Sequence, residues 1–179
     1  MQWLNEPKEW SSENDVLKVE VDPGTDFWRI THYDFIRDSG HFYFQEQDGD
    51  FVAAVRIRGD YRELYDQGGL MIRIDEKNWI KAGIEFVGGV QNLSAVVTRK
   101  FSDWSVVQRK DNPPEVWFKM KREKDFVEVS YSFDQQEFAM LRLAYFPPDV
   151  SVQIGMMCAA PDGKGFPIRF DNFSVQSLD

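Results

Sequence analysis

The 179-residue sequence predicts an all-β protein, a two-sheet antiparallel jelly-roll sandwich of about a dozen strands with little or no helix. Short apolar runs recur at a spacing of roughly 8–12 residues, which is typical of sandwiches and barrels. Aromatic residues make up 15% of the chain, and they suit pleated, half-buried surfaces. No window of helical length carries apolar residues at i, i+3, i+4 and i+7. A chain of this length is expected to form one domain, residues 1–179.

Turn residues separate the predicted strands. The pair Asp48 and Gly49 lies between the runs at 42–45 and 51–58, a pattern typical of a tight hairpin. Proline pairs at 113–114 and 147–148 also lie between runs, where a missing N–H disturbs no strand pairing. Residues 61–65 are predicted to form one helical turn. The remaining strands are predicted at 16–21, 69–75, 79–86, 93–99, 104–109, 116–122, 126–133, 137–143, 150–158 and 168–175.

Alternation along each run separates core side chains from those on the outer face, because successive residues of a strand point to opposite sides. In the run at 79–86 the apolar side chains Ile80 and Ile84 share one face. The opposite faces of three runs are predicted to carry Met71 and Arg73; Trp79, Lys81 and Glu85; and Trp117 with Lys119 and Lys121.

Two cations are predicted to lie side by side on one of these faces. A three-residue turn at 76–78 would place Asp75 opposite Trp79 and Arg73 opposite Lys81. Like charges directly opposite each other destabilise a sheet. The pairing therefore indicates a carboxylate from another strand, a bound anion, or a solvated face on which the two side chains splay apart. Glu85 lies about 13 Å along the strand from Lys81, which is too far to neutralise it directly.

Charge and cysteine content exclude several functional classes. A formal net charge of -9 argues against nucleic acid and against an anionic membrane surface. A lone cysteine, Cys158, allows no intrachain disulfide, and the first residues lack the features of a signal peptide. No stretch approaches the ~20 apolar residues of a membrane helix. A cytoplasmic location is the expectation.

Several segments, in order along nearly the whole chain, resemble the family named "regulation of enolase protein". This family is a domain of unknown function within the concanavalin A-like lectin/glucanase superfamily. The segments are TDFW (25–28), IRDSGHF (36–42), YDQGGLMIR (65–73), NWIKAGIEF (78–86), LSAVVT (93–98) and SDWS (102–105). The resemblance implies a jelly roll with a concave sheet, the surface on which sugar-binding relatives hold carbohydrate. It implies no particular activity.

One string matches the Glu-x-Asp-x-x-Glu pattern of some retaining glucanases in this superfamily: Glu123, Asp125 and Glu128. Such enzymes need two carboxyl groups about 5–5.5 Å apart, one of them with a raised pKa. Residues 121–125, however, have the composition of a hairpin turn, so the first two carboxylates are predicted to lie in water at its tip. No catalytic residue is therefore expected.

Metal and cofactor sites are not expected either. Residues 46–50 have the acidic composition of a calcium loop but lack its distal glutamate. His32 and His41 have no histidine or cysteine partners at zinc spacing.

The sequence predicts a non-catalytic binding module with a carbohydrate-type or anionic ligand on the concave sheet. Two alternatives remain open: a glycoside hydrolase- or lyase-like enzyme, and a regulatory module that binds an unidentified protein partner. Tryptophan side chains would stack on a sugar ring, and their neighbours would supply hydrogen bonds, charge and contact. The predicted ligand-binding residues are Gln67, Met71, Arg73, Trp79, Lys81, Glu85, Trp104 and Trp117.

Overall fold

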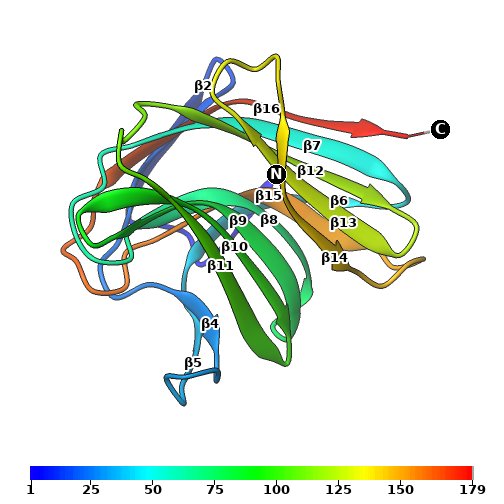
Figure 1. Cartoon of the computed structure of the whole chain (residues 1–179), viewed down its shortest axis with the longest axis horizontal. Coiled ribbons are helices and arrows are strands. Elements are labelled where there is room, and N and C mark those ends of the chain that lie inside the picture. Colours follow the sequence, from blue (N-terminus) through cyan, green and yellow to red (C-terminus); the bar gives the residue numbers. More distant parts are fainter. Residues whose placement is uncertain (179) are drawn as a thin grey trace.

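The structure, a computed structural model, describes residues 1–178 and contains sixteen strands. Fourteen of them form two seven-stranded antiparallel sheets that face each other (Figure 1). This arrangement confirms the predicted jelly-roll sandwich. None of the described residues forms a helix that could cross a membrane.

We call the two layers the front sheet and the back sheet. In spatial order the front sheet comprises β1 (Gln2–Leu4), β6 (His41–Gln47), β15 (Val152–Ala159), β8 (Gln67–Asp75), β9 (Asn78–Val87), β10 (Val90–Arg99) and β11 (Phe101–Arg109). The back sheet comprises β14 (Ala139–Tyr145), β13 (Phe126–Ser132), β12 (Val116–Glu123), β7 (Phe51–Gly59), β16 (Pro167–Ser177), β3 (Val16–Glu20) and β2 (Glu9–Glu13). A separate hairpin consists of β4 (Phe27–Arg29) and β5 (Ile36–Asp38).

Each predicted run contains a strand, but four strands were not predicted: β1, β2, β4 and β5. They are three to five residues long, which is too short to show a clear alternation. The helical turn predicted at 61–65 is wrong. The Asp66 carboxylate accepts the backbone N–H groups of Arg62 and Glu63, and Tyr65 has a φ of 67°, so the segment is a turn.

The core between the two sheets follows the predicted alternation. Phe51 and Phe118 of the back sheet are buried against Ile80 and Ile154 of the front sheet. One exception is Phe133: alternation along the run at 126–133 predicts that it faces inward with Val127 and Val129, but it lies just beyond the end of β13 and is 36% exposed.

The hairpin between β12 and β13 also confirms its prediction. Residues 124 and 125 form the turn, and Glu123 pairs with Phe126 at its base. The carboxylate of Asp125 is therefore exposed at a hairpin tip rather than held on the floor of a cleft. Glu123, which was predicted to lie in water beside it, is half-buried and forms an ion pair with Lys121.

The pairing of β8 with β9 differs from the predicted register. The turn contains two residues rather than three, and the ladder shifts between Arg73 and Asp75. As a result, Arg73 lies opposite Trp79, and Met71 lies opposite Lys81. The two cations are not direct neighbours, so the predicted repulsion between them does not arise.

The β4–β5 hairpin packs on the free face of the front sheet, below the curved strands β9–β11 in Figure 1. It buries a second apolar cluster, in which the ring centroids of Phe27 and Trp79 lie 6.2 Å apart. Two polar contacts anchor the hairpin. Arg73 donates two hydrogen bonds, of 2.7 and 2.8 Å, to the Asp38 carboxylate, and the backbone N–H of Arg29 donates to the buried hydroxyl of Ser102 at 2.9 Å. The hairpin therefore covers the part of the free face that carries Met71 and Trp79.

Candidate functional site

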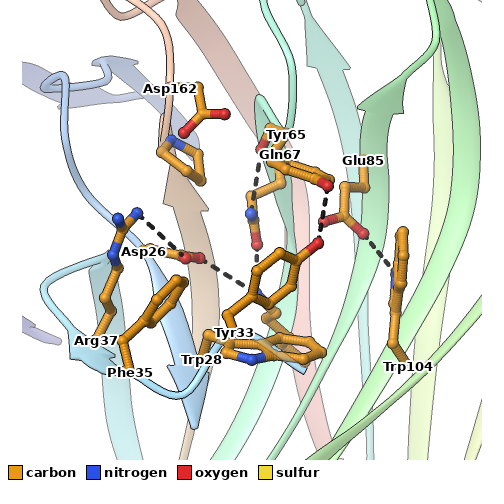
Figure 2. A pocket seen from close by; sticks show the side chains of 12 residues that line it. Asp26, Trp28, Tyr33, Phe35, Arg37, Tyr65, Gln67, Glu85, Trp104 and Asp162 are labelled. Carbon is orange, nitrogen blue, oxygen red and sulfur yellow. Dashed lines mark hydrogen bonds and ion pairs between the residues drawn. The ribbon is translucent and has the colours of Figure 1, made fainter. Parts of the chain in front are cut away.

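A pocket of about 240 Å³ lies beside the hairpin on the uncovered part of the front sheet (Figure 2). Its floor comes from β8 and β9. Its walls come from β11, from the hairpin arm (residues 26–38, which contain β4 and β5), and from the loops that precede β8 and follow β15. The lining residues are Asp26, Trp28, Tyr33, Phe35, Arg37, Tyr65, Gln67, Lys81, Glu85, Trp104, Pro161 and Asp162.

The floor of the pocket is organised around the buried ammonium group of Lys81. Its Nζ donates to Gln67 Oε1 at 2.5 Å and to the backbone carbonyl of Phe27 at 2.8 Å, and it lies 3.9 Å from Asp26 Oδ1. Burial lowers the pKa of Lys81, while the carboxylates of Asp26 and Glu85 oppose that shift. The cation therefore has its partners within the protein.

Two carboxyl groups also line the pocket in buried surroundings. Asp26 Oδ1 accepts the backbone N–H of Phe27 at 2.8 Å, and Glu85 Oε2 accepts Trp104 Nε1 at 2.7 Å and the Ser94 hydroxyl at 2.9 Å. Burial raises the pKa of both carboxyl groups, and Lys81 partly counteracts the shift. Both groups thus retain a proton to higher pH than exposed carboxylates do.

Exposed aromatic rings form the rim of the pocket. The Tyr33 and Tyr65 hydroxyls lie 2.9 Å apart and share a hydrogen bond, which raises the pKa of Tyr65 to about 12. Trp104 is 39% exposed, and its indole packs edge-on against the Tyr65 ring at 6.4 Å between centroids. Because its N–H is bonded to Glu85, the indole is held in one orientation, as Figure 2 shows.

The structure brings together some of the predicted ligand-binding residues in this pocket. These are Gln67, Lys81, Glu85 and Trp104. They come from three strands of one sheet, and in β9 the alternation placed Lys81 and Glu85 on the same face correctly.

The other predicted residues lie elsewhere. Met71 and Trp79 do lie on the free face of the front sheet, but the hairpin buries them, so they are not accessible to a ligand. Arg73 forms an ion pair with Asp38 of β5, which is the carboxylate from another strand that the sequence left open as one partner for this cation. Trp117 belongs to β12 and therefore lies on the back sheet, away from the pocket.

Several pocket residues were not predicted, because they lie in the hairpin arm and in loops without strand periodicity. They are Asp26, Trp28, Tyr33, Phe35, Arg37, Tyr65, Pro161 and Asp162. The segments 25–28, 36–42 and 65–73, which carry the family resemblance, contain Asp26, Trp28, Arg37 and Tyr65. The family resemblance of those segments was therefore the only feature of the sequence that pointed to these four pocket residues. No cluster of three or more His, Cys, Asp or Glu side chains suited to a metal ion occurs within residues 1–178.

The fold defines a class, the two-sheet antiparallel β-sandwich proteins. Within it, the chain belongs to the family described as "Protein of unknown function (DUF1349)", whose model matches residues 3–178. It is 40% identical over 173 residues to "Regulation of enolase protein 1" of Saccharomyces cerevisiae, which covers 97% of this chain and 87% of that relative. The family resemblance seen in the sequence is thus confirmed.

One solved structure supports the same assignment, and two more distant ones share the fold. A functionally unknown protein from Saccharomyces cerevisiae superposes with a TM-score of 0.95 at 39% identity, over 99% of this chain and 96% of the other. The carbohydrate binding module CBM66 from Bacillus subtilis gives a TM-score of 0.60 at 16% identity, over 98% and 95%. The GH43 protein BlXynB from Bacillus licheniformis gives 0.74 at 13% identity, but this chain covers only 36% of that protein. The last two similarities establish the fold alone.

Proposed function

We propose that this protein is a non-catalytic carbohydrate-binding module whose pocket holds one neutral sugar ring. The observation that carries the proposal is the exposed indole of Trp104 beside the polar floor formed by Gln67 and Glu85. Binding pockets for small molecules combine apolar and aromatic walls with a few convergent polar groups. A sugar ring presents an apolar face to an indole and hydroxyl groups at its edge, and so fits both parts of the pocket.

The charges of the pocket favour a neutral ligand. Arg73 and Lys81 both have internal partners, so neither requires an anion, and the carboxyl groups of Asp26 and Glu85 oppose one. A cationic ligand would meet the ammonium of Lys81 and the guanidinium of Arg37. A polyhydroxylated neutral molecule can donate hydrogen bonds to the carboxyl oxygens and avoids both repulsions.

The fold comparison is consistent with this proposal. The carbohydrate binding module from Bacillus subtilis covers nearly the full length of this chain, and this chain covers nearly all of it. The two proteins therefore share a β-sandwich architecture, on which a sugar site is a property of local side chains.

Trp104→Ala is expected to weaken sugar binding at least about tenfold, because truncating an aromatic hot-spot residue costs about 2 kcal/mol or more and a factor of ten corresponds to about 1.4 kcal/mol. Isothermal titration of the wild type and the variant with a panel of neutral mono- and oligosaccharides measures the effect. Trp10→Ala is the matched control, because Trp10 is 38% exposed on β2 of the back sheet. A wild type that binds no sugar in the panel, or equal affinities for wild type and Trp104→Ala, would refute the site.

A glycosidase is the rival function, and one observation favours it: the pocket holds two carboxyl groups of raised pKa, Asp26 and Glu85. A glycosidase needs a protonated carboxyl group as its general acid. We expect no hydrolysis, since Glu85 Oε2 already accepts hydrogen bonds from Trp104 and Ser94. Release of reducing sugar from the same panel by the wild type, with loss of that activity in Glu85→Gln, would establish the enzyme instead.

A further inference from the structure

We infer that the pocket selects a free monosaccharide or the terminal ring of a chain, and that the Tyr33–Tyr65 bridge imposes this selectivity. The inference rests on the proposed carbohydrate function and adds the class of sugar ligand. It follows from the size of the pocket, from the hairpin and the Tyr33–Tyr65 hydrogen bond that border it, and from the conformation of the hairpin tip.

The pocket is small and blocked on one side. Its volume of about 240 Å³ lies below the range of roughly 300–1,000 Å³ found for drug-sized ligands, so it suits a single ring. The β4–β5 hairpin buries Trp79 and Met71 and so removes the adjacent part of the sheet from contact with ligand. An interior ring of a polysaccharide needs an exit for each of its two neighbours, whereas a terminal ring needs one.

The bridge joins two walls of the pocket. Tyr33 comes from the hairpin tip and Tyr65 from the loop before β8, and their hydroxyls lie 2.9 Å apart. Figure 2 shows the Tyr33 ring across the pocket, with Glu85 and Trp104 to one side and Asp26 to the other. A sugar chain that continued between the hairpin tip and the loop before β8 would meet this hydrogen bond.

The hairpin tip is built to hold Tyr33 in this position. Ile30, His32 and Asp34 adopt φ values of 66°, 68° and 56°, in the left-handed region that a β-branched residue such as Ile30 rarely enters. The indole N–H of Trp28 donates to the Thr31 carbonyl at 2.9 Å and so fastens the tip. Strained backbone persists only where its surroundings determine it, and it concentrates at ligand sites.

The Tyr33 ring is supported on both sides as well. It stacks on Phe35 with 5.4 Å between centroids and packs edge-on against Trp28 at 5.7 Å. The bridge is therefore part of a packed aromatic wall and not a loose side chain on the surface.

The polar groups also suit a terminal ring. Asp26, Glu85 and Asp162 all line the pocket, and their oxygens accept hydrogen bonds. A terminal ring keeps one more free hydroxyl than an interior ring, because only one of its positions is used for a linkage. The pocket thus offers acceptors for the hydroxyl that distinguishes an end from the middle of a chain.

Chain-length dependence tests the inference. We would titrate the wild type with mono-, tri- and hexasaccharides of glucose, xylose and fructose, and with cyclic glucans, which have no ends. Terminal-ring binding predicts affinities within about threefold across the lengths of the preferred sugar and no binding of the cyclic glucans. Affinity that rises tenfold or more with length, or binding of a cyclic glucan, would overturn the inference and leave the proposed function intact. No binding of any probe would overturn both.

Variants of the bridge complete the test. Tyr33→Ala should open the pocket, so that affinity rises at least tenfold from mono- to hexasaccharide. Tyr65→Phe removes only the partner hydroxyl and should produce a smaller change in the same direction. Ile36→Ala is the control, because Ile36 is 55% exposed on the same hairpin and does not line the pocket. Circular dichroism confirms that each variant folds. Affinity of Tyr33→Ala that stays independent of chain length would show that the bridge does not set the selectivity.

Discussion

Lys81→Met is expected to destabilise the protein by about 3–5 kcal/mol, the usual cost of removing one partner from a buried ionic network. The variant leaves Gln67 Oε1 and the Phe27 carbonyl without their donor, and it leaves the carboxyl groups of Asp26 and Glu85 without the cation that offsets their burial. Equilibrium unfolding in urea at neutral pH measures the loss. Lys18→Met, at an exposed position of β3, is the control and should change stability by no more than about 0.5 kcal/mol.

The loss in Lys81→Met should also depend on pH. Burial already raises the pKa of Asp26 and Glu85, and removal of Lys81 raises both further. A carboxyl group whose pKa is higher in the folded state than in the unfolded state favours folding most when it is protonated, and that contribution is lost as pH rises through the folded pKa. The difference from wild type should therefore be larger at pH 8 than at pH 5. A difference that is equal at both pH values, or absent, would show that Lys81 does not balance these carboxyl groups.

Trp79→Ala is expected to cost about 3–5 kcal/mol in the free energy of unfolding, as large-to-small changes of buried aromatic residues do. Trp79 is 1% exposed and packs against Phe27 of the hairpin, so its removal leaves a cavity between hairpin and sheet. Trp104→Ala removes an indole that is 39% exposed and should cost less than about 1.5 kcal/mol.

The two tryptophan variants thus distinguish a residue that stabilises the fold, Trp79, from a residue that contacts the proposed ligand, Trp104. Urea unfolding should show the large loss for Trp79→Ala alone, and titration should show the loss of sugar binding for Trp104→Ala. Equal stabilities for the two variants would contradict the burial of Trp79 beneath the hairpin. Both tryptophans lie on the free face of the same sheet, so only the cover over one of them distinguishes their roles.

Local patterns in the sequence predicted much of the architecture correctly. Alternation assigned Ile80 and Ile84 to one face of β9, and Lys81 and Glu85 to the other. Turn composition placed Asp125 at a hairpin tip, and this placement argued against reading Glu123, Asp125 and Glu128 as a glucanase motif. These predictions succeeded because the direction of a side chain in a strand and the chemistry of a tight turn depend on residues close in sequence.

Turn length and sheet identity were harder to predict. The β8–β9 turn is one residue shorter than expected and the ladder shifts by one more residue between Arg73 and Asp75, which together moved Arg73 from opposite Lys81 to opposite Trp79. Alternation also assigned Trp117 to an outer face, but nothing in its own segment showed that this face belongs to the back sheet. Strand order depends on pairing between segments far apart in the chain.

The sequence by itself determined that this protein is a jelly-roll sandwich and which side of each long strand faces the core. Only the tertiary structure decided which part of the free face is a pocket. Asp38, thirty-five residues before Arg73, neutralises that cation, and Phe27 buries Trp79 while its carbonyl accepts a hydrogen bond from Lys81. The physical reason is that a side chain's direction is set by its own strand, whereas its exposure and its charge partners are set by whichever distant segment packs over it.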